Sequence, residues 1–152
     1  MRVLHFPALV GGNPPALART EREIGLDSTC VADVPTEYGW NGDKTLCPNG
    51  AGHVRRAVAR LAASRRYRGS YDVIHFNFGQ TALNRFGLGL DIPSWKRTGA
   101  TVFMTFQGSD VRPESILSPE SARTLRGRVS ESFRKKYVHN VTKWCDHMFC
   151  LN

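Results

Sequence analysis

An apolar stretch that turns abruptly into small polar residues holds the side chains best suited to chemistry. The run Thr101–Phe106 is rich in β-branched and aromatic residues, which predicts a buried strand. Gln107-Gly108-Ser109-Asp110 follows at once, and Arg112 comes two residues later. Their amide, hydroxyl, carboxylate and guanidinium groups can bind hydroxyl, phosphate or carboxylate groups. The same residue types are common in turns, so this stretch taken alone favours a plain strand-to-helix turn over a ligand site.

Two further polar loops follow predicted strands. The strand Arg2–Phe6 precedes a loop with Gly11, Gly12 and Asn13, and a strand over Tyr71–Phe76 precedes Asn77, Phe78, Gly79, Gln80 and Thr81. Parallel strands place such loops at one edge of a sheet, so a ligand site is expected there. A glycine loop before a helix can receive an anion, although a plain tight loop explains the glycine pair at least as well. The dinucleotide fingerprint and the Walker A sequence are both absent. His75 lies inside its strand, which predicts a buried, hydrogen-bonded histidine rather than a catalytic one.

Strands alternate with helices along the whole chain, which predicts an α/β fold. Asn13 caps a helix that begins at Pro14 and ends at Gly25, with Leu17, Ala18 and Ile24 facing inward. The remaining predicted segments are a strand at 28–32, a loop at 33–52, helices at 53–68 and 92–98, a long helix reaching Trp144, and a final strand at 145–151. No helix follows that last strand, so we expect the sheet to be incomplete.

The helix predicted at His53–Arg68 is strongly basic. Val54, Val58 and Leu61, with Ala57, form one stripe that we expect to face the core. The other faces carry six arginines and no acidic residue: Arg55, Arg56, Arg60, Arg65, Arg66 and Arg68. A solvated helix face and a surface that contacts anionic lipid both explain this pattern.

Composition narrows the class of protein and of partner. The 152 residues are 41% hydrophobic, which suits one globular domain, and 21 Lys and Arg against 13 Asp and Glu give a net charge of +8. Such an excess favours an anionic partner. No apolar run approaches the roughly 20 residues of a membrane span. The four scattered cysteines fit a reducing cytosol, and Cys145, His147 and Cys150 match no standard zinc spacing, so no metal site is predicted.

Four segments follow one another along the chain: Gly11-Gly12-Asn13-Pro14, Tyr71–Gly79, Asp91–Gly99 and Thr105–Arg112. In this order they resemble the amino-terminal domain of GT-B glycosyltransferases of the family-4 type. The closing segment Cys145–Asn152 is similar to a strand of that family, and the resemblance covers essentially the whole chain. It implies a Rossmann-like parallel sheet with helices on both faces, the amino-terminal half of a GT-B fold.

The resemblance also implies a reaction and residue roles. The reaction would be a retaining, metal-independent transfer of a hexose from a nucleotide sugar, with no cofactor. Gly11, Gly12 and Asn13 would approach the donor diphosphate, and Gln107 and Asp110 would face the transferred sugar as catalytic residues. The acceptor, a glycan or a lipid phosphate, would contact Asn77, Phe78, Gly79, Gln80, Gly108, Ser109 and Arg112. The family often has histidine where Gln107 stands, and glutamine cannot take a proton near neutral pH.

On this hypothesis residues 1–152 are a single acceptor-side domain, and the carboxy-terminal donor-binding domain is absent. We expect the chain alone to be inactive, and the donor domain to act in cis or as a partner chain. The expected location is the cytoplasm, with the inner membrane face as a docking surface. The alternative is a non-catalytic Rossmann-like module that binds a nucleotide or phospho-ligand together with a partner protein. Nucleic acid is disfavoured, because no recognisable spacing of basic and aromatic residues is present.

Overall fold

Six parallel strands form one sheet in the computed structural model, which describes residues 1–36, 38–83, 87–107 and 131–150. The order across the sheet is β3-β2-β1-β4-β5-β6, and every neighbouring pair is parallel. The strands are β1 (Arg2–Phe6), β2 (Asp27–Ala32), β3 (Lys44–Thr45), β4 (Val73–Asn77), β5 (Thr101–Phe106) and β6 (His147–Cys150). The predicted α/β, Rossmann-like arrangement is therefore confirmed.

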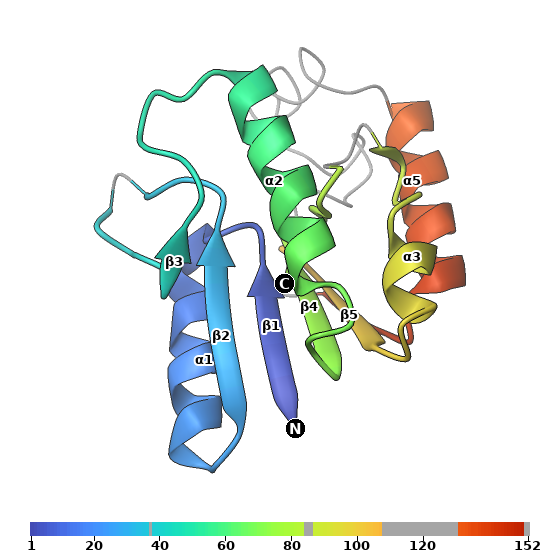
Figure 1. The fold of residues 1–152 in the computed structure, drawn as a ribbon. Coiled ribbons are helices and arrows are strands. Elements are labelled where there is room, and N and C mark those ends of the chain that lie inside the picture. Colours follow the sequence, from blue (N-terminus) through green and yellow to red (C-terminus); the bar gives the residue numbers. More distant parts are fainter. Residues whose placement is uncertain (37, 84–86, 108–130, 151–152) are drawn as a thin grey trace.

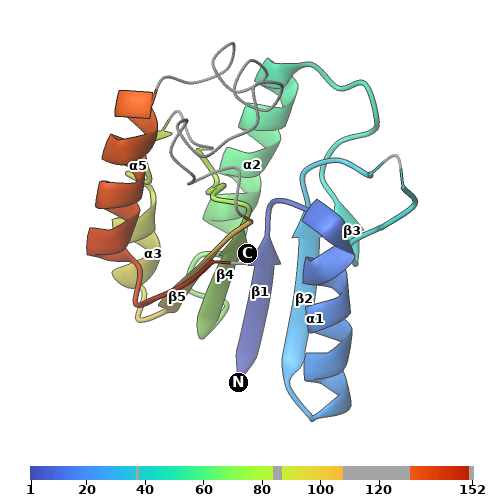
Figure 2. The same cartoon turned by 180° about the vertical axis from the view of Figure 1, so that it is seen from behind.

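Helices cover the two faces of the sheet unequally (Figures 1 and 2). The short helix η1 (Val10–Gly12) leads into α1 (Asn13–Glu23), which lies on one face. The opposite face carries α2 (His53–Tyr67), α3 (Ile92–Lys96) and α5 (Glu131–Trp144). The chain runs toward one sheet edge from β1 to β2 and toward the other from β4 to β6. Right-handed crossovers therefore place α1 on one side and the later helices on the other.

The main core lies between the sheet and the face with three helices. Ile74 and Phe76 of β4 and Val102 and Met104 of β5 point into it, where they meet the fully buried Trp95 of α3. Because side chains alternate along a strand, residues 75, 77, 103 and 105 point to the other face. There α1 packs on β1 and β2 over a small cluster, Leu9, Ala18, Cys30 and Ala32. Among the described residues, no helix covers β4 and β5 on that face.

The structure corrects the predicted face of α2. Val54, Val58 and Leu61 are exposed (79%, 61% and 39%), whereas the buried residues of the helix are Arg60, Ala63, Ser64 and Tyr67. The inward face of α2 is set by hydrogen bonds that its arginines make to a residue distant in the sequence. Arg60 and the half-buried Arg56 donate to the buried carboxylate of Asp33 at the end of β2.

Other differences are smaller. The segment predicted as a loop at 33–52 contains the two-residue strand β3. Asn13 is the first residue of α1 rather than its cap, and Gly12 precedes it in a left-handed conformation. Ile24 is exposed (73%) instead of facing inward. The first part of the long carboxy-terminal helix, before residue 131, lies outside the described residues.

Candidate functional site

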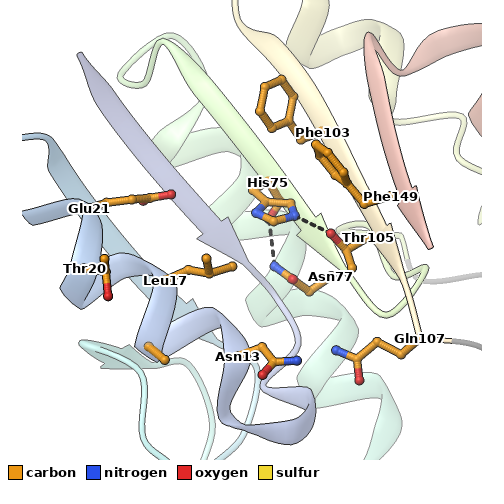
Figure 3. A pocket seen from close by; sticks show the side chains of 11 residues that line it. Asn13, Leu17, Thr20, Glu21, His75, Asn77, Phe103, Thr105, Gln107 and Phe149 are labelled. Carbon is orange, nitrogen blue, oxygen red and sulfur yellow. Dashed lines mark hydrogen bonds between the residues drawn. The ribbon is translucent and has the colours of Figure 1, made fainter. Parts of the chain in front are cut away.

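A cavity of about 630 Å³ lies between α1 and the open half of the sheet (Figure 3). Small-molecule sites typically fall in the range of about 300–1,000 Å³. The lining residues come from α1, β4, β5, β6 and the residue after β5: Asn13, Ala16, Leu17, Thr20, Glu21, His75, Asn77, Phe103, Thr105, Gln107 and Phe149. The size and the mixed chemistry suit a small molecule with polar and apolar parts.

The polar end of the cavity lies where the strand order reverses. Asn13 follows β1, Asn77 ends β4 and Gln107 follows β5, so all three stand at the carboxyl edge of the sheet. The Nε2 of Gln107 donates a hydrogen bond to the carbonyl of Val10 (3.4 Å), which ties the end of β5 to the glycine loop. Figure 3 shows the amides of Asn13 and Gln107 facing each other. Ligands of open parallel sheets bind at such a reversal.

Both glycines of the loop have a backbone conformation that favours glycine, and Gly12 is in addition packed against a side chain. Gly11 and Gly12 both have positive φ, 64° and 69°. A side chain on Gly11 would meet Gln107 and Asn13 only at ordinary contact distances, the nearest atom being 3.6 Å away. A side chain on Gly12 would lie 3.1 Å from the ring of Trp40. The hydroxyl of Thr36 holds Trp40 in place, since it donates to the carbonyl and accepts from the N–H of that residue.

We expect Gly12→Ala to lower the free energy of unfolding more than Gly11→Ala. The left-handed backbone alone costs about 1–2 kcal/mol for either alanine. Contact with the Trp40 ring adds about 1 kcal/mol or more for Gly12 only. Urea unfolding of both variants measures the difference, and Trp40→Ala should remove it. Equal losses in the two variants would contradict the packing of Trp40 on Gly12.

A histidine and a threonine form the floor of the cavity. Nε2 of His75 and Oγ1 of Thr105 share a hydrogen bond of 2.7 Å, and His75 is only 8% exposed. Burial, and then the neighbouring His5, lower the pKa of His75 from 6.5 to about 4, while Glu21 acts in the opposite direction. The imidazole is therefore neutral at pH 7 and offers one donor and one acceptor. This agrees with the predicted role of a buried, hydrogen-bonded histidine.

A second polar group lies beside the first, under α1. Oε2 of Glu21 lies 2.8 Å from Nε2 of the fully buried His5 and accepts a 2.6 Å hydrogen bond from the hydroxyl of Ser28. The rings of His5 and His75 are 5.0 Å apart. Nδ1 of His5 is buried and has no hydrogen-bond partner among the described residues. A chain of contacts thus runs from Ser28 of β2 through the Glu21 carboxylate of α1 to His5 of β1, and on through His75 of β4 to Thr105 of β5.

The opposite end of the cavity is apolar. Phe103 of β5 and Phe149 of β6 pack edge to face, with ring centres 5.9 Å apart. Leu17 of α1 also lines the cavity and is 41% exposed, and Phe149 is 48% exposed. A ligand that fills the cavity therefore meets amide and hydroxyl groups at one end and aromatic rings at the other.

The predicted site residues divide into three groups. Asn13, Asn77 and Gln107 line the cavity, and Gly11 lies against Gln107. Gly12 packs on Trp40 instead. Phe78, Gly79 and Gln80 do not line the cavity, because the chain turns at Phe78 (φ 56°) and the N–H of Gly79 bonds to the carbonyl of Thr105. The remaining predicted residues, Gly108, Ser109, Asp110 and Arg112, lie outside the described residues.

Several lining residues were not predicted, although the sequence carries their signal. Residues 13, 16, 17, 20 and 21 recur at helical spacing and form one face of α1. Residues 75 and 77, and 103, 105 and 107, recur at strand spacing. The helical spacing on α1 and the alternation along the strands together identify these lining residues, once it is known which strands are neighbours.

Among the described residues, no group of three or more His, Cys, Asp or Glu side chains could hold a metal ion. Within the same ranges, no helix is long and apolar enough to cross a membrane. No protein-family model matches the chain, and comparisons with curated proteins and with solved structures find no match either.

Proposed function

We propose that this chain is the acceptor-side domain of a glycosyltransferase and binds a glycan or lipid-linked acceptor in the cavity. A donor domain, in cis or on a partner chain, would supply the nucleotide sugar. One observation carries the proposal: the ends of β1, β4 and β5 meet around the cavity where the strand order reverses, and Gln107 joins the glycine loop there. The resemblance to GT-B amino-terminal domains supports the same assignment.

The chemistry of the polar end suits sugar hydroxyls. Asn77 and Gln107 carry both donors and acceptors, and His75 and Thr105 add an uncharged pair below them. Such groups bind hydroxyls without taking their protons, so they would orient an acceptor rather than ionise it. The backbone N–H groups of the glycine loop stand at the start of α1, where the helix dipole favours a donor phosphate.

The aromatic end favours an acceptor with an apolar part. Phe103 and Phe149 line the cavity, and aromatic rings pack against the apolar face of a sugar or against a hydrocarbon chain. A lipid-linked or aromatic glycoside would fill both ends of the cavity, whereas a free monosaccharide would fill only one.

Binding to the intact 152-residue chain tests the proposal. Alkyl glycosides, prenyl phosphates and nucleotide sugars are screened by ligand-observed NMR, and we expect the first or second class to bind and nucleotide sugars to bind weakly. Gln107→Ala should weaken acceptor binding about fivefold, because one hydrogen bond is worth about 1 kcal/mol. Gln80→Ala is the matched control, since Gln80 follows β4 but does not line the cavity.

Two outcomes would contradict the proposal. One is the absence of binding by every glycoside and prenyl phosphate. The other is tight binding of a nucleotide or nucleotide sugar to this chain alone that is lost in Gly11→Ala. That result would favour the alternative of a non-catalytic module whose glycine loop binds a phosphate by itself.

A further inference from the structure

We propose that α2 docks this protein on an anionic membrane surface and inserts Val54, Val58 and Leu61 among the lipid head groups. The three side chains are 79%, 61% and 39% exposed. Their spacing of four and three residues puts them on one face of the helix. The buried face of α2 belongs instead to Arg60, Ala63, Ser64 and Tyr67, so the apolar stripe points away from the sheet.

The charge around this stripe is of one sign. From Lys44 to Tyr71 the sequence contains no Asp or Glu. Arg55, Arg65 and Arg66 are exposed, and none of them forms an ion pair with a carboxylate in the described part of the chain. Arg56 and Arg60 differ, because both donate to Asp33 and are turned inward. The outward face of α2 thus combines apolar side chains with uncompensated guanidinium groups.

A lipid surface explains both features together. Guanidinium groups bind phosphates, and an interfacial helix presents apolar side chains between its basic residues. An acidic protein would satisfy the arginines, but it would give the stripe of valine and leucine no apolar partner. Each arginine near an anionic surface increases binding about fivefold, and the short apolar stripe adds to this, so we expect reversible attachment.

The position of α2 is compatible with the proposed site. The helix lies on the face opposite α1 and the cavity (Figures 1 and 2). Docking through α2 therefore leaves the cavity uncovered. The docking proposal rests on α2 alone and does not depend on glycosyl transfer.

Vesicle co-sedimentation of the full chain tests the docking. The vesicles are phosphatidylcholine alone, or phosphatidylcholine with about one third phosphatidylglycerol, an anionic fraction that gives a negative surface potential. We expect at least tenfold stronger binding to the anionic vesicles, and a loss of that difference at high salt because screening weakens surface charge interactions. Equal, salt-independent binding to both vesicles would overturn the proposal.

Variants with matched controls distinguish the contribution of the apolar stripe to vesicle binding from that of the arginine charges. Val58→Asp should reduce binding at least tenfold, whereas Ile24→Asp adds the same charge at a 73% exposed position after α1 and should not. Arg55→Gln with Arg65→Gln should reduce binding about 25-fold, at about fivefold each. Lys136→Gln with Lys143→Gln removes two exposed charges from α5 as the control.

Polyglutamate distinguishes a membrane from an acidic protein. Membrane docking would be overturned if Val58→Asp left vesicle binding unchanged and polyglutamate fully displaced the protein from the vesicles. The arginines would then be assigned to an acidic polypeptide. Since Val58 and the substituted arginines are exposed, circular dichroism should show that every variant keeps the fold.

Discussion

Replacing Asp33 with asparagine is expected to lower the free energy of unfolding by about 3–5 kcal/mol, the usual cost of breaking a buried ion pair. Asp33 is 4% exposed, and its Oδ2 accepts hydrogen bonds from Arg56 (2.8 and 3.0 Å) and Arg60 (3.2 Å). Arg60 is itself only 7% exposed. Removing the carboxylate charge leaves the Arg60 guanidinium buried without compensation, because α2 cannot turn this side chain to water without losing its packing.

Urea unfolding of the variant measures the loss. Glu131→Gln is the matched control, since Glu131 pairs with Lys135 at 3.0 Å on the surface and such pairs contribute about 0–1 kcal/mol. Combining Asp33→Asn with Arg60→Met should cost less than the sum of the two single changes, because the uncompensated charge is then gone. Additive losses, or a loss from Asp33→Asn no larger than that of the control, would contradict the buried cluster.

The ion pairs of Asp33 with Arg56 and Arg60 also explain why the sequence predicts the wrong inward face for α2. Helical periodicity offers two faces, one with Val54, Val58 and Leu61 and one with small residues and arginine, and hydropathy favours the first. The ion pair with Asp33 turns the face with arginine and small residues inward. Asp33, however, lies 27 residues before Arg60 and belongs to another element. A contact across that separation leaves no local pattern. The strand β3 was missed for a related reason, because two residues within a glycine- and proline-rich segment show no period.

The candidate site was predictable only in part. Alternation of strands and helices predicts parallel strands, and parallel strands bring Asn13, Asn77 and Gln107 to one edge. The sequence does not show which face of the sheet stays open. His75, Phe103 and Phe149 lie in strands that read as continuous apolar runs, so their exposure to a cavity depends on the absence of a covering helix among the described residues. That depends on the order of the strands, which local patterns do not encode.

His75 in the cavity floor leads to the second prediction, that the protein loses stability in mild acid. The pKa of His75 is lowered to about 4 from its ordinary 6.5, chiefly by burial. Between these values the unfolded chain takes up a proton that the folded chain does not, so the free energy of unfolding falls as the pH decreases from 6.5 to about 4. A shift of this size corresponds to about 3 kcal/mol at most, since each pKa unit is worth about 1.4 kcal/mol.

His75→Gln isolates this contribution. Glutamine can keep a hydrogen bond to Thr105 but does not titrate, so the variant should lose less stability than the natural chain between pH 6.5 and 4.5 in urea unfolding experiments. His139→Gln, which removes an exposed histidine of α5 that does not line the cavity, is the matched control. The groups that face the imidazole are His5, Glu21, Thr105 and the rings of Phe103 and Phe149, and only Glu21 among them favours its protonation. An NMR titration that found His75 protonated near pH 6.5 would contradict the burial of the ring, and with it the uncharged cavity floor on which hydroxyl binding depends.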